Sequence, residues 1–426
     1  MFGWEFPPHI TGGLGTACFG LTQGLAKKNI DVIFVVPKAF GDEDKSFIRL
    51  VAAEDIDINL TKIELEEFWR KIHYLEISSN IVPYIDPEEY ARLIEKAELE
   101  GSSTNESNSK RKFRFSGKYG INLMDEVTRY ALIASNLAIH QQFDVIHAHD
   151  WLTYPAGTAA KMVSGKPLIV HVHATEFDRS GENINKNVFE IERRGMEVAD
   201  KVITVSNLTR NIVISKYGIP EEKVITVHNA VDFGSDFEID EFSKKVPEQI
   251  VTFLGRVTFQ KGPDYFVEAA NKVLKKNQNV RFVMAGSGDM LNRMIRRVAE
   301  LGIANKFHFT GFLKGNDVNR MFQMSDVYVM PSVSEPFGIS PLEAMRSNVP
   351  VIISKQSGVA EVLKYAIKID FWDIDAMADS IYGLLNYRAL SNFFIKYGQE
   401  EVNSLKWENA ADGIKGVYES IIQEKQ

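Results

Sequence analysis

The chain has 426 residues, more than the roughly 250–300 at which one hydrophobic core usually divides, so its length favours two domains. Its 45% hydrophobic and 25% charged residues are typical of a well-packed globular protein. The net charge of −8 offers no basic field to nucleic acid, and a single cysteine, Cys18, excludes an internal disulfide framework. No apolar run is long enough to span a bilayer, so we expect a soluble, cytoplasmic protein without integral membrane association.

Short runs rich in valine and isoleucine alternate with helical patterns along nearly the whole chain, which is typical of βαβ units and parallel sheets. In the first half the predicted strands are Asp31–Val36, Lys71–Ile77, Asp144–His147, Leu168–His173, Lys201–Val205 and Lys223–Val227. In the second half they are Ile250–Leu254, Val280–Ala285, Lys306–Thr310, Asp326–Met330 and Val349–Ile353. The pattern predicts an α/β protein with two sheets.

An acidic, irregular segment, Asp232–Pro247, separates the two sets of strands and is predicted to link two domains. The first domain then comprises residues 1–232 and the second comprises residues 248–404. Residues 405–426 continue as a helix, and the apolar stripe that begins at Trp407 needs a partner surface.

A glycine-rich turn, Gly12–Gly15, follows the apolar segment Met1–Phe6 and precedes a helical pattern. Its glycines let backbone N–H groups approach a phosphate or a sugar at the positive end of a helix, although a plain strand-to-helix turn explains the same residues. The third glycine of the dinucleotide-binding pattern is missing here and after Gly286–Gly288, which disfavours an NAD oxidoreductase. Because Met1–Phe6 is short for a central strand, we expect that residues ahead of it are missing.

Two cations, Arg256 and Lys261, lie in a glycine-bracketed loop directly after the predicted strand Ile250–Leu254. Ligands bind at the carboxyl ends of strands in open α/β sheets. An arginine fork beside a lysine can neutralise a diphosphate there. Two solvated surface cations are the alternative, and the place of both residues inside one loop favours binding.

The segment Pro331–Met345 follows another predicted strand and carries two glutamates. Pro336 keeps Glu335 out of a helix, so we expect its carboxylate in a loop, either solvated or facing a ligand. Ser340 fits an N-cap and Glu343 the third helical position, which together form a capping box. Capping alone would explain Glu343, but the same helix start also offers amides to phosphate and a carboxylate to a ribose.

Histidines gather with Asp150 at the ends of two neighbouring predicted strands; they are His147, His149, His171 and His173. Paired His-x-His patterns suit a metal such as zinc. Alternation points each pair to one face, however, and histidines that are simply hydrogen-bonded are commoner at strand ends. No metal site is therefore predicted.

These segments, in this order, resemble the retaining GT-B glycosyltransferases of the glycogen and starch synthase type, families 4 and 5. The resemblance covers nearly the whole chain. It is strongest over Phe253–Val362, where Gly-Arg-x4-Lys-Gly precedes Ala-Gly-x-Gly, Phe-x-Gly-Phe, Pro-Ser-x3-Glu-Pro-Phe-Gly and Glu-Ala-Met. It implies two Rossmann-like domains that face each other across a cleft, with the final helix crossing back to the N-terminal domain.

The resemblance also implies a role for each matching residue. In the C-terminal domain the residues implied to hold the nucleotide sugar are Arg256, Lys261, Phe312, Gly338, Ile339, Ser340 and Glu343. Of these, Arg256 and Lys261 would neutralise the diphosphate and Glu343 would bind the ribose. Glu335 would bind the donor sugar beside the reacting carbon. On the N-terminal side, His173 and Asp150 would form a catalytic wall, and Gly12 and Gly13 would face the sugar and phosphates.

The activity implied is that of a hexosyltransferase that needs no metal or cofactor, with a nucleotide sugar such as UDP-glucose or ADP-glucose as its substrate. We favour a growing α-glucan as the acceptor, because the chain lacks a basic amphipathic face. A family-4 transferase that acts on a lipid-linked or cell-surface oligosaccharide is the alternative. A nucleotide-sugar epimerase and a non-catalytic binding protein are further hypotheses. Bacterial glycogen synthases carry a lysine where this chain has Ile10, so their ADP-glucose branch is matched less closely.

Overall fold

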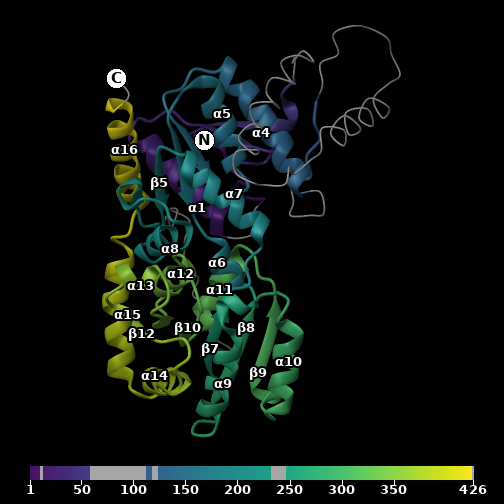
Figure 1. The fold of residues 1–426 in the computed structure, drawn as a ribbon. Coiled ribbons are helices and arrows are strands. Elements are labelled where there is room, and N and C mark those ends of the chain that lie inside the picture. The colour runs from purple at the N-terminus through teal and green to yellow at the C-terminus, as the bar shows by residue number, and fades with distance from the viewer. Residues whose placement is uncertain (10–12, 58–111, 118–122, 232–245, 425–426) are drawn as a thin grey trace.

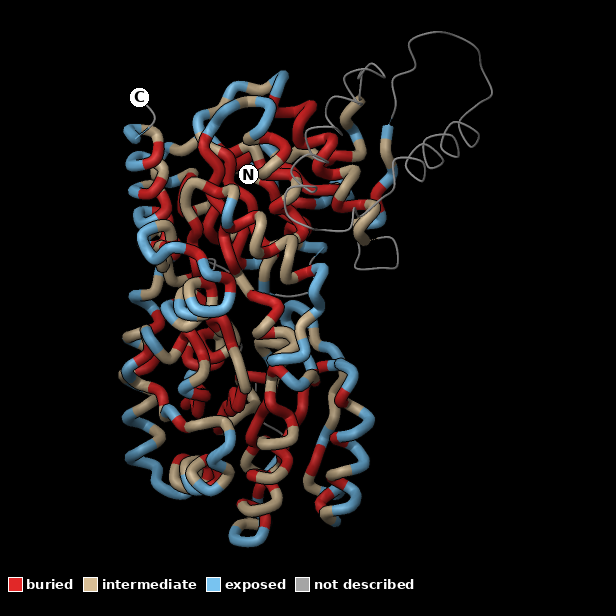
Figure 2. Tube along the Cα trace, in the orientation of Figure 1, coloured by how far each residue is buried: buried red, intermediate tan, exposed pale blue. Residues whose placement is uncertain are grey.

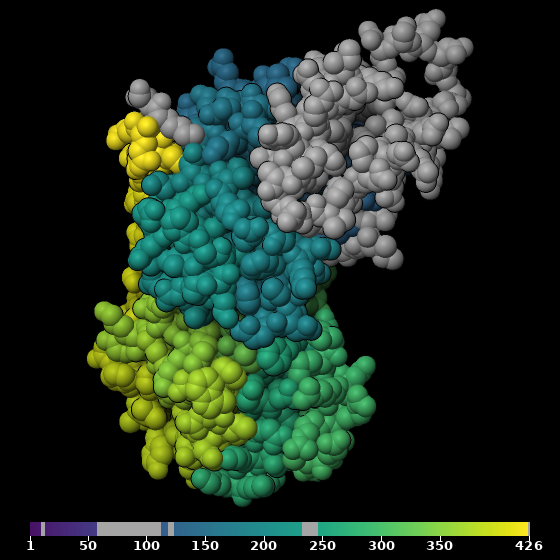
Figure 3. Space-filling view, viewed as in Figure 1, coloured from purple at the N-terminus to yellow at the C-terminus, as the bar shows by residue number. Residues whose placement is uncertain are grey.

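The computed structural model describes residues 1–9, 13–57, 112–117, 123–231 and 246–424. Figure 1 shows these residues in an N-terminal half and a C-terminal half, and the space-filling view in Figure 3 shows the two halves in direct contact. Both halves combine parallel strands with helices, which confirms the predicted α/β class.

In the N-terminal half the described strands pair in parallel, in the orders β1-β2 and β3-β4-β5-β6. They are β1 (Ile33–Val36), β2 (Arg49–Ala52), β3 (Ile146–His149), β4 (Leu168–Val172), β5 (Lys201–Thr204) and β6 (Val224–Thr226). The backbone at Phe2 joins the two groups, because it forms parallel bridges to both Val35 and Ala148. The helices of this half are α1 (Gly13–Lys27), α4 (Leu123–His140), α5 (Tyr154–Ser164), α6 (Glu176–Ser180), α7 (Lys186–Val198) and α8 (Asn207–Tyr217).

The C-terminal half contains a parallel sheet in the order β12-β11-β10-β7-β8-β9. Its strands are β7 (Gln249–Leu254), β8 (Val280–Ala285), β9 (Phe307–Gly311), β10 (Val327–Met330), β11 (Val351–Ser354) and β12 (Ile367–Ile369). Its helices are α9 (Pro263–Leu274), α10 (Leu291–Glu300), α11 (Asn316–Met324), α12 (Ser340–Arg346), α13 (Val359–Val362), α14 (Ile374–Asn386) and α15 (Arg388–Val402). The chain order reverses between β7 and β10, and such a switch point is where open α/β sheets bind ligands.

Four single turns of 3-10 helix complete the described elements; they are η1 (Ala53–Asp55), η2 (Glu221–Lys223), η3 (Phe259–Lys261) and η4 (Ala304–Lys306). Strands such as β4 are buried along their whole length because helices cover both faces of a parallel sheet, as the red interior of Figure 2 shows.

Most predicted strands agree with the structure to within two residues, and the prediction missed the edge strands β2 and β12. The predicted strand Lys71–Ile77 and nearly all of the linker Asp232–Pro247 lie outside the described residues.

The last helix, α16 (Trp407–Gln423), packs on α1 of the N-terminal half (Figure 1). Its Trp407 and Ile414 share a buried core with Leu21 and Leu25, so the apolar stripe has the partner surface that it needs. The contact is close because Gly20 has no side chain: a Cβ there would lie 2.1 Å from Trp407 Nε1.

Gly20→Ala is therefore expected to lower the free energy of unfolding, because the added methyl group must displace a buried indole. Overpacking of this kind costs about 1–3 kcal/mol. Urea denaturation of the variant measures the loss. Gly416→Ala is the matched control, since Gly416 lies in α16 with nothing within 4 Å of its Cβ position, and it should be neutral or stabilising by up to ~1 kcal/mol. Equal stability of the two variants would contradict the packing of α16 on α1.

Candidate active site

Glycines bring the carboxyl ends of β7, β8 and β9 close together. The N–H of Gly286 donates to the carbonyl of Gly311 at 2.8 Å, and a Cβ on Gly286 would lie 1.8 Å from the carbonyl oxygen of Gly255. Arg256 and Phe312 follow these strand ends, and both are exposed. The loops thus present the Arg256 guanidinium and the Phe312 ring beyond the carboxyl ends of the strands.

An ion pair connects the loop after β7 with the loop after β10. Lys261 Nζ contacts Glu335 Oε2, and Ser332 Oγ donates to the same oxygen at 3.3 Å. Glu335 is only 6% exposed, which excludes the alternative of a solvated loop acid. The sequence suggested separate roles for Lys261 and Glu335, whereas the structure places their charges side by side.

Backbone contacts fix the loop that carries Glu335. Its N–H donates to the carbonyl of Gln356 at 3.0 Å, and its carbonyl accepts from the N–H of Gly358 at 2.8 Å. Gly338 adopts a φ of 98°, and a Cβ there would lie 3.1 Å from Glu335 Cγ. These two backbone hydrogen bonds fix the main chain at Glu335 without involving its carboxylate.

The predicted capping box of Ser340 and Glu343 is wrong. Ile339 occupies the N-cap of α12 and makes no side-chain cap, while Ser340 is already helical. The hydroxyl of Ser340 bonds instead to Tyr328 Oη at 2.7 Å, because β10 brings that phenol beside the start of the helix. Glu343 is half-buried without a capping role, and loss of solvation raises the pKa of its carboxyl to about 7.

On the N-terminal side, Asp150 and His173 lie together at the ends of β3 and β4. Asp150 accepts the N–H of His173 at 2.8 Å and that of Ala174 at 3.3 Å. Burial raises the pKa of Asp150 to about 6, and the charge of Arg179 opposes this rise. His173 Nε2 lies 3.0 Å from His149 Nδ1, and burial lowers the pKa of His173 to about 3, so its ring is neutral at neutral pH.

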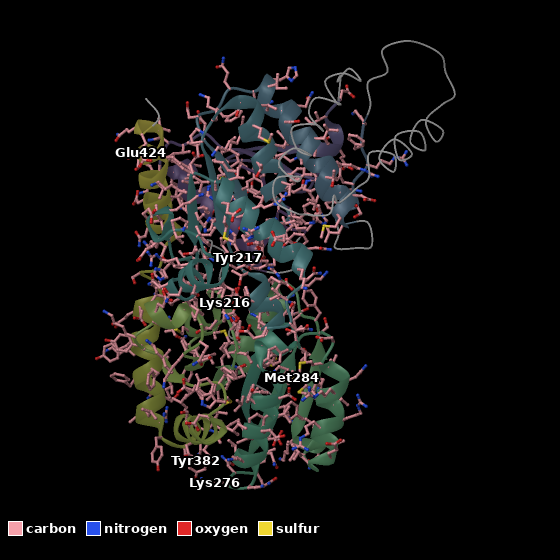
Figure 4. The ribbon with its side chains drawn as sticks, viewed as in Figure 1. Lys216, Tyr217, Lys276, Met284, Tyr382 and Glu424 are labelled. Atoms are coloured by element: carbon pink, nitrogen blue, oxygen red, sulfur yellow. The ribbon has the colours of Figure 1, made fainter. Side chains whose placement is uncertain are left out.

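A buried ionic network behind Asp150 was missed by the sequence analysis. Arg179 pairs with Glu176 at 3.3 Å and with Glu192. The hydroxyl of Tyr217, a residue labelled in Figure 4, donates to Glu192. The network positions α6, whose capping box of Thr175 and Asp178 has the Thr-x-x-Asp pattern. That pattern is the signal in the sequence that marks the start of α6.

The strand ends of the two halves meet at these loops. Ser334 Oγ, in the loop of Glu335, donates to Asp178 Oδ1 of α6 at 2.5 Å. A Cβ on Gly13, at the start of α1, would lie 3.9 Å from Ile339 Cδ1. The structure therefore brings the described part of the glycine turn towards α12, while Gly12 lies outside the described residues.

Two family models match successive parts of the chain. The model for glycosyl transferases group 1 matches residues 235–401, and the model for Glycosyltransferase Family 4 matches residues 103–234. Among curated relatives, an uncharacterized glycosyltransferase of Methanocaldococcus jannaschii is 27% identical over 99% of this chain and 98% of its own length. The glycogen synthase of Mycobacterium tuberculosis is 21% identical over 98% of this chain and 93% of its own.

An Escherichia coli enzyme, UDP-Gal:alpha-D-GlcNAc-diphosphoundecaprenol alpha-1,3-galactosyltransferase, is 24% identical over 67% of this chain and 77% of its own. The fold is similar to that of sucrose-phosphate synthase from Thermosynechococcus elongatus, with a TM-score of 0.69 and 16% identity over 97% of this chain and 94% of that one. It is also similar to Anabaena HepE in complex with UDP-glucose, with a TM-score of 0.58 and 18% identity over 68% of this chain and 82% of that one. Within the described residues, no helix combines the length and apolar character needed to cross a membrane.

The raised pKa of Glu343 predicts a pH-dependent effect of Glu343→Gln. Because the folded protein holds the proton more tightly than the unfolded chain, the stability from this group is present below a pH of 4.5 and is lost as the pH rises through about 7. Glutamine carries no such proton. The Tm of the variant minus that of the wild type should therefore rise between about pH 5 and about pH 8. The exposed Glu222→Gln serves as the control. A difference in Tm that stays constant for Glu343→Gln would contradict the burial of this carboxyl.

Proposed function

The chain belongs to the GT-B glycosyltransferases, and from this premise we propose that it transfers a hexose, in the first instance glucose, from a nucleotide sugar to a glycan with retention of configuration. The observation that carries the proposal is the Lys261–Glu335 pair at the switch point of the C-terminal sheet, with Arg256 in the same loop as Lys261. We propose an α-glucan as the acceptor, as in glycogen synthase. The cytoplasmic location stays a prediction from the sequence.

The donor diphosphate is proposed to bind at the loop after β7. Arg256 presents an exposed guanidinium there, and Lys261 adds a second positive charge. Positive groups that are already in place stabilise the charge that develops on a departing diphosphate. When the donor binds, Lys261 Nζ is expected to be shared between the diphosphate and Glu335.

Glu335 is proposed to accept hydrogen bonds from hydroxyl groups of the donor sugar. Its carboxylate oxygens are hydrogen-bond acceptors, and one of them already contacts Lys261 Nζ. His173 and Asp150 are proposed to contact the same sugar from the N-terminal side. The contact between Ser334 and Asp178 brings the two walls together and so helps to exclude water, which would hydrolyse the donor.

A transferase that acts on a lipid-linked oligosaccharide is the second candidate, since the name of the Escherichia coli relative includes a diphosphoundecaprenol-linked sugar. One assay separates the candidates. UDP-glucose and ADP-glucose are each incubated with glycogen or with a polyprenyl-diphosphate sugar, and nucleoside diphosphate release is measured. Extension of glycogen supports the proposal, and NMR of the new linkage reports its configuration. Transfer to the lipid-linked sugar alone would favour the second candidate, and an epimerised donor without transfer would favour an epimerase.

Transfer should not require a divalent ion at the diphosphate, because Arg256 and Lys261 supply the positive charge. Adding Mg²⁺ or Mn²⁺ to the assay is expected to change kcat by less than ~2-fold, whereas Lys261→Ala should lower it by more than ~10-fold. The mechanism would be wrong if a chelator abolished turnover and Mg²⁺ or Mn²⁺ restored it.

Replacing Glu335 and replacing Glu343 should have different effects on catalysis and on nucleotide binding. Glu335→Ala is expected to fold and to bind the nucleoside diphosphate at least as well as the wild type, since it leaves Lys261 free, while kcat falls by ~100-fold or more. Glu343→Ala should instead weaken binding of the nucleoside diphosphate, because the ribose loses its acceptor.

Calorimetric titration of both variants with UDP and ADP, alongside steady-state kinetics, measures these effects. The second variant is the control for the first, because each removes one carboxylate from the same segment. Near-normal turnover of Glu335→Ala would defeat the catalytic assignment.

A further inference from the structure

A cluster of three histidines lies deeper in the N-terminal half than the proposed sugar site, on the strands β3 and β4. His147, His149 and His171 are each at most 2% exposed. The rings of His147 and His149 stack with their centroids 4.3 Å apart, and the ring of His171 lies 5.3 Å from each of them. The proposed transfer gives these three rings no direct role.

Two of the six ring nitrogens of this cluster form hydrogen bonds. His147 Nδ1 bonds to Tyr418 Oη at 2.6 Å, and His149 Nδ1 bonds to His173 Nε2 at 3.0 Å. The Nε2 atoms of His147 and His149 and both ring nitrogens of His171 are buried without a hydrogen-bond partner. Buried polar atoms normally have a partner, so four such nitrogens in one cluster require an explanation.

We propose that His147, His149 and His171 bind one transition-metal cation of the Zn²⁺ class. One ring nitrogen of each residue lies within 4.8 Å of the other two. Zinc–nitrogen bonds of about 2.0–2.1 Å hold nitrogens about 3.4 Å apart, so the rings must tilt out of their nearly parallel stack to point at one ion. Three imidazoles suit Zn²⁺, Co²⁺, Ni²⁺ and Cu²⁺ and leave a fourth position for water.

The surroundings of the rings fit the proposal. Histidine ligands usually bond through their second nitrogen to a neighbouring group, and Tyr418 and His173 occupy that position here.

A second group, Cys18 with His149 and His173, also has its potential ligand atoms within 4.8 Å of one another. It is the weaker candidate, because its two histidines already bond to each other. Burial and the neighbouring Asp150 also raise the pKa of the Cys18 thiol, which opposes the thiolate that a metal would bind.

An ion on His149 Nε2 would place the ring proton on Nδ1, which then donates to His173 Nε2. His173 would in turn carry its proton on Nδ1. The metal would therefore orient His173, the residue that the proposed function places against the donor sugar, without touching the sugar itself.

The test is elemental analysis of the untagged full chain, followed by titration of the chelator-treated protein with Zn²⁺. The wild type is expected to hold about one ion per chain and to gain in Tm when Zn²⁺ is added. His171→Asn removes a ligand without breaking a hydrogen bond, and it should hold less than about 0.1 ion and show no gain. His308→Asn is the control, since His308 is exposed on β9, and it should behave as the wild type does.

A wild-type chain that holds less than about 0.1 ion after incubation with equimolar Zn²⁺ would overturn the proposal, and so would His171→Asn with the wild-type content. Circular dichroism shows whether His171→Asn folds. If it does not, the visible spectrum of the wild type with Co²⁺ decides: absorption bands typical of tetrahedral nitrogen ligation support the site, and their absence contradicts it. Neither readout depends on transfer activity, so failure of the metal site is distinguishable from failure of the proposed function.

Discussion

The ion pair between Lys261 and Glu335 joins the loops that follow β7 and β10, and the rest of the candidate site is arranged around it. A carboxylate as buried as that of Glu335 needs a positive partner, since removing one member of a buried pair typically costs about 3–5 kcal/mol. The pairing requires the two strands to be neighbours, which the reversed strand order provides. Gly262 then lets the two loops approach closely, since a Cβ there would lie 2.0 Å from the carbonyl oxygen of Pro331.

The loop that carries Glu335 also contacts the N-terminal half, so the N-terminal and C-terminal sides of the site are coupled. Ser334 bonds to Asp178 on one side, and Phe337 packs with Val205 and Val231 on the other. Farther along, Glu361 accepts the first N–H groups of α8, which places a negative charge at the positive end of that helix. Any movement of the halves relative to each other must therefore act on the loop of Glu335.

Much of this arrangement follows from local sequence, and the rest depends on tertiary contacts. The β-branched runs predict most described strands, and their ends place Arg256 and Lys261 at one edge of the sheet. The prediction missed the edge strands β2 and β12, in which only the last residue is buried. The partner of Lys261 lies 74 residues away in sequence, so no local pattern identifies it. The capping box failed because Tyr328, on another element, takes the hydroxyl of Ser340.

The central claim is that a donor diphosphate binds at the switch point and is neutralised by protein cations. A crystal structure of the complex with UDP and Mg²⁺ tests it most directly. The account predicts phosphate oxygens within about 3 Å of Lys261 Nζ and of the Arg256 guanidinium, with the uridine extending towards Phe312 and Glu343. A diphosphate bound away from the ends of β7 and β10, or held there by Mg²⁺ while Lys261 stays paired only with Glu335, would contradict it.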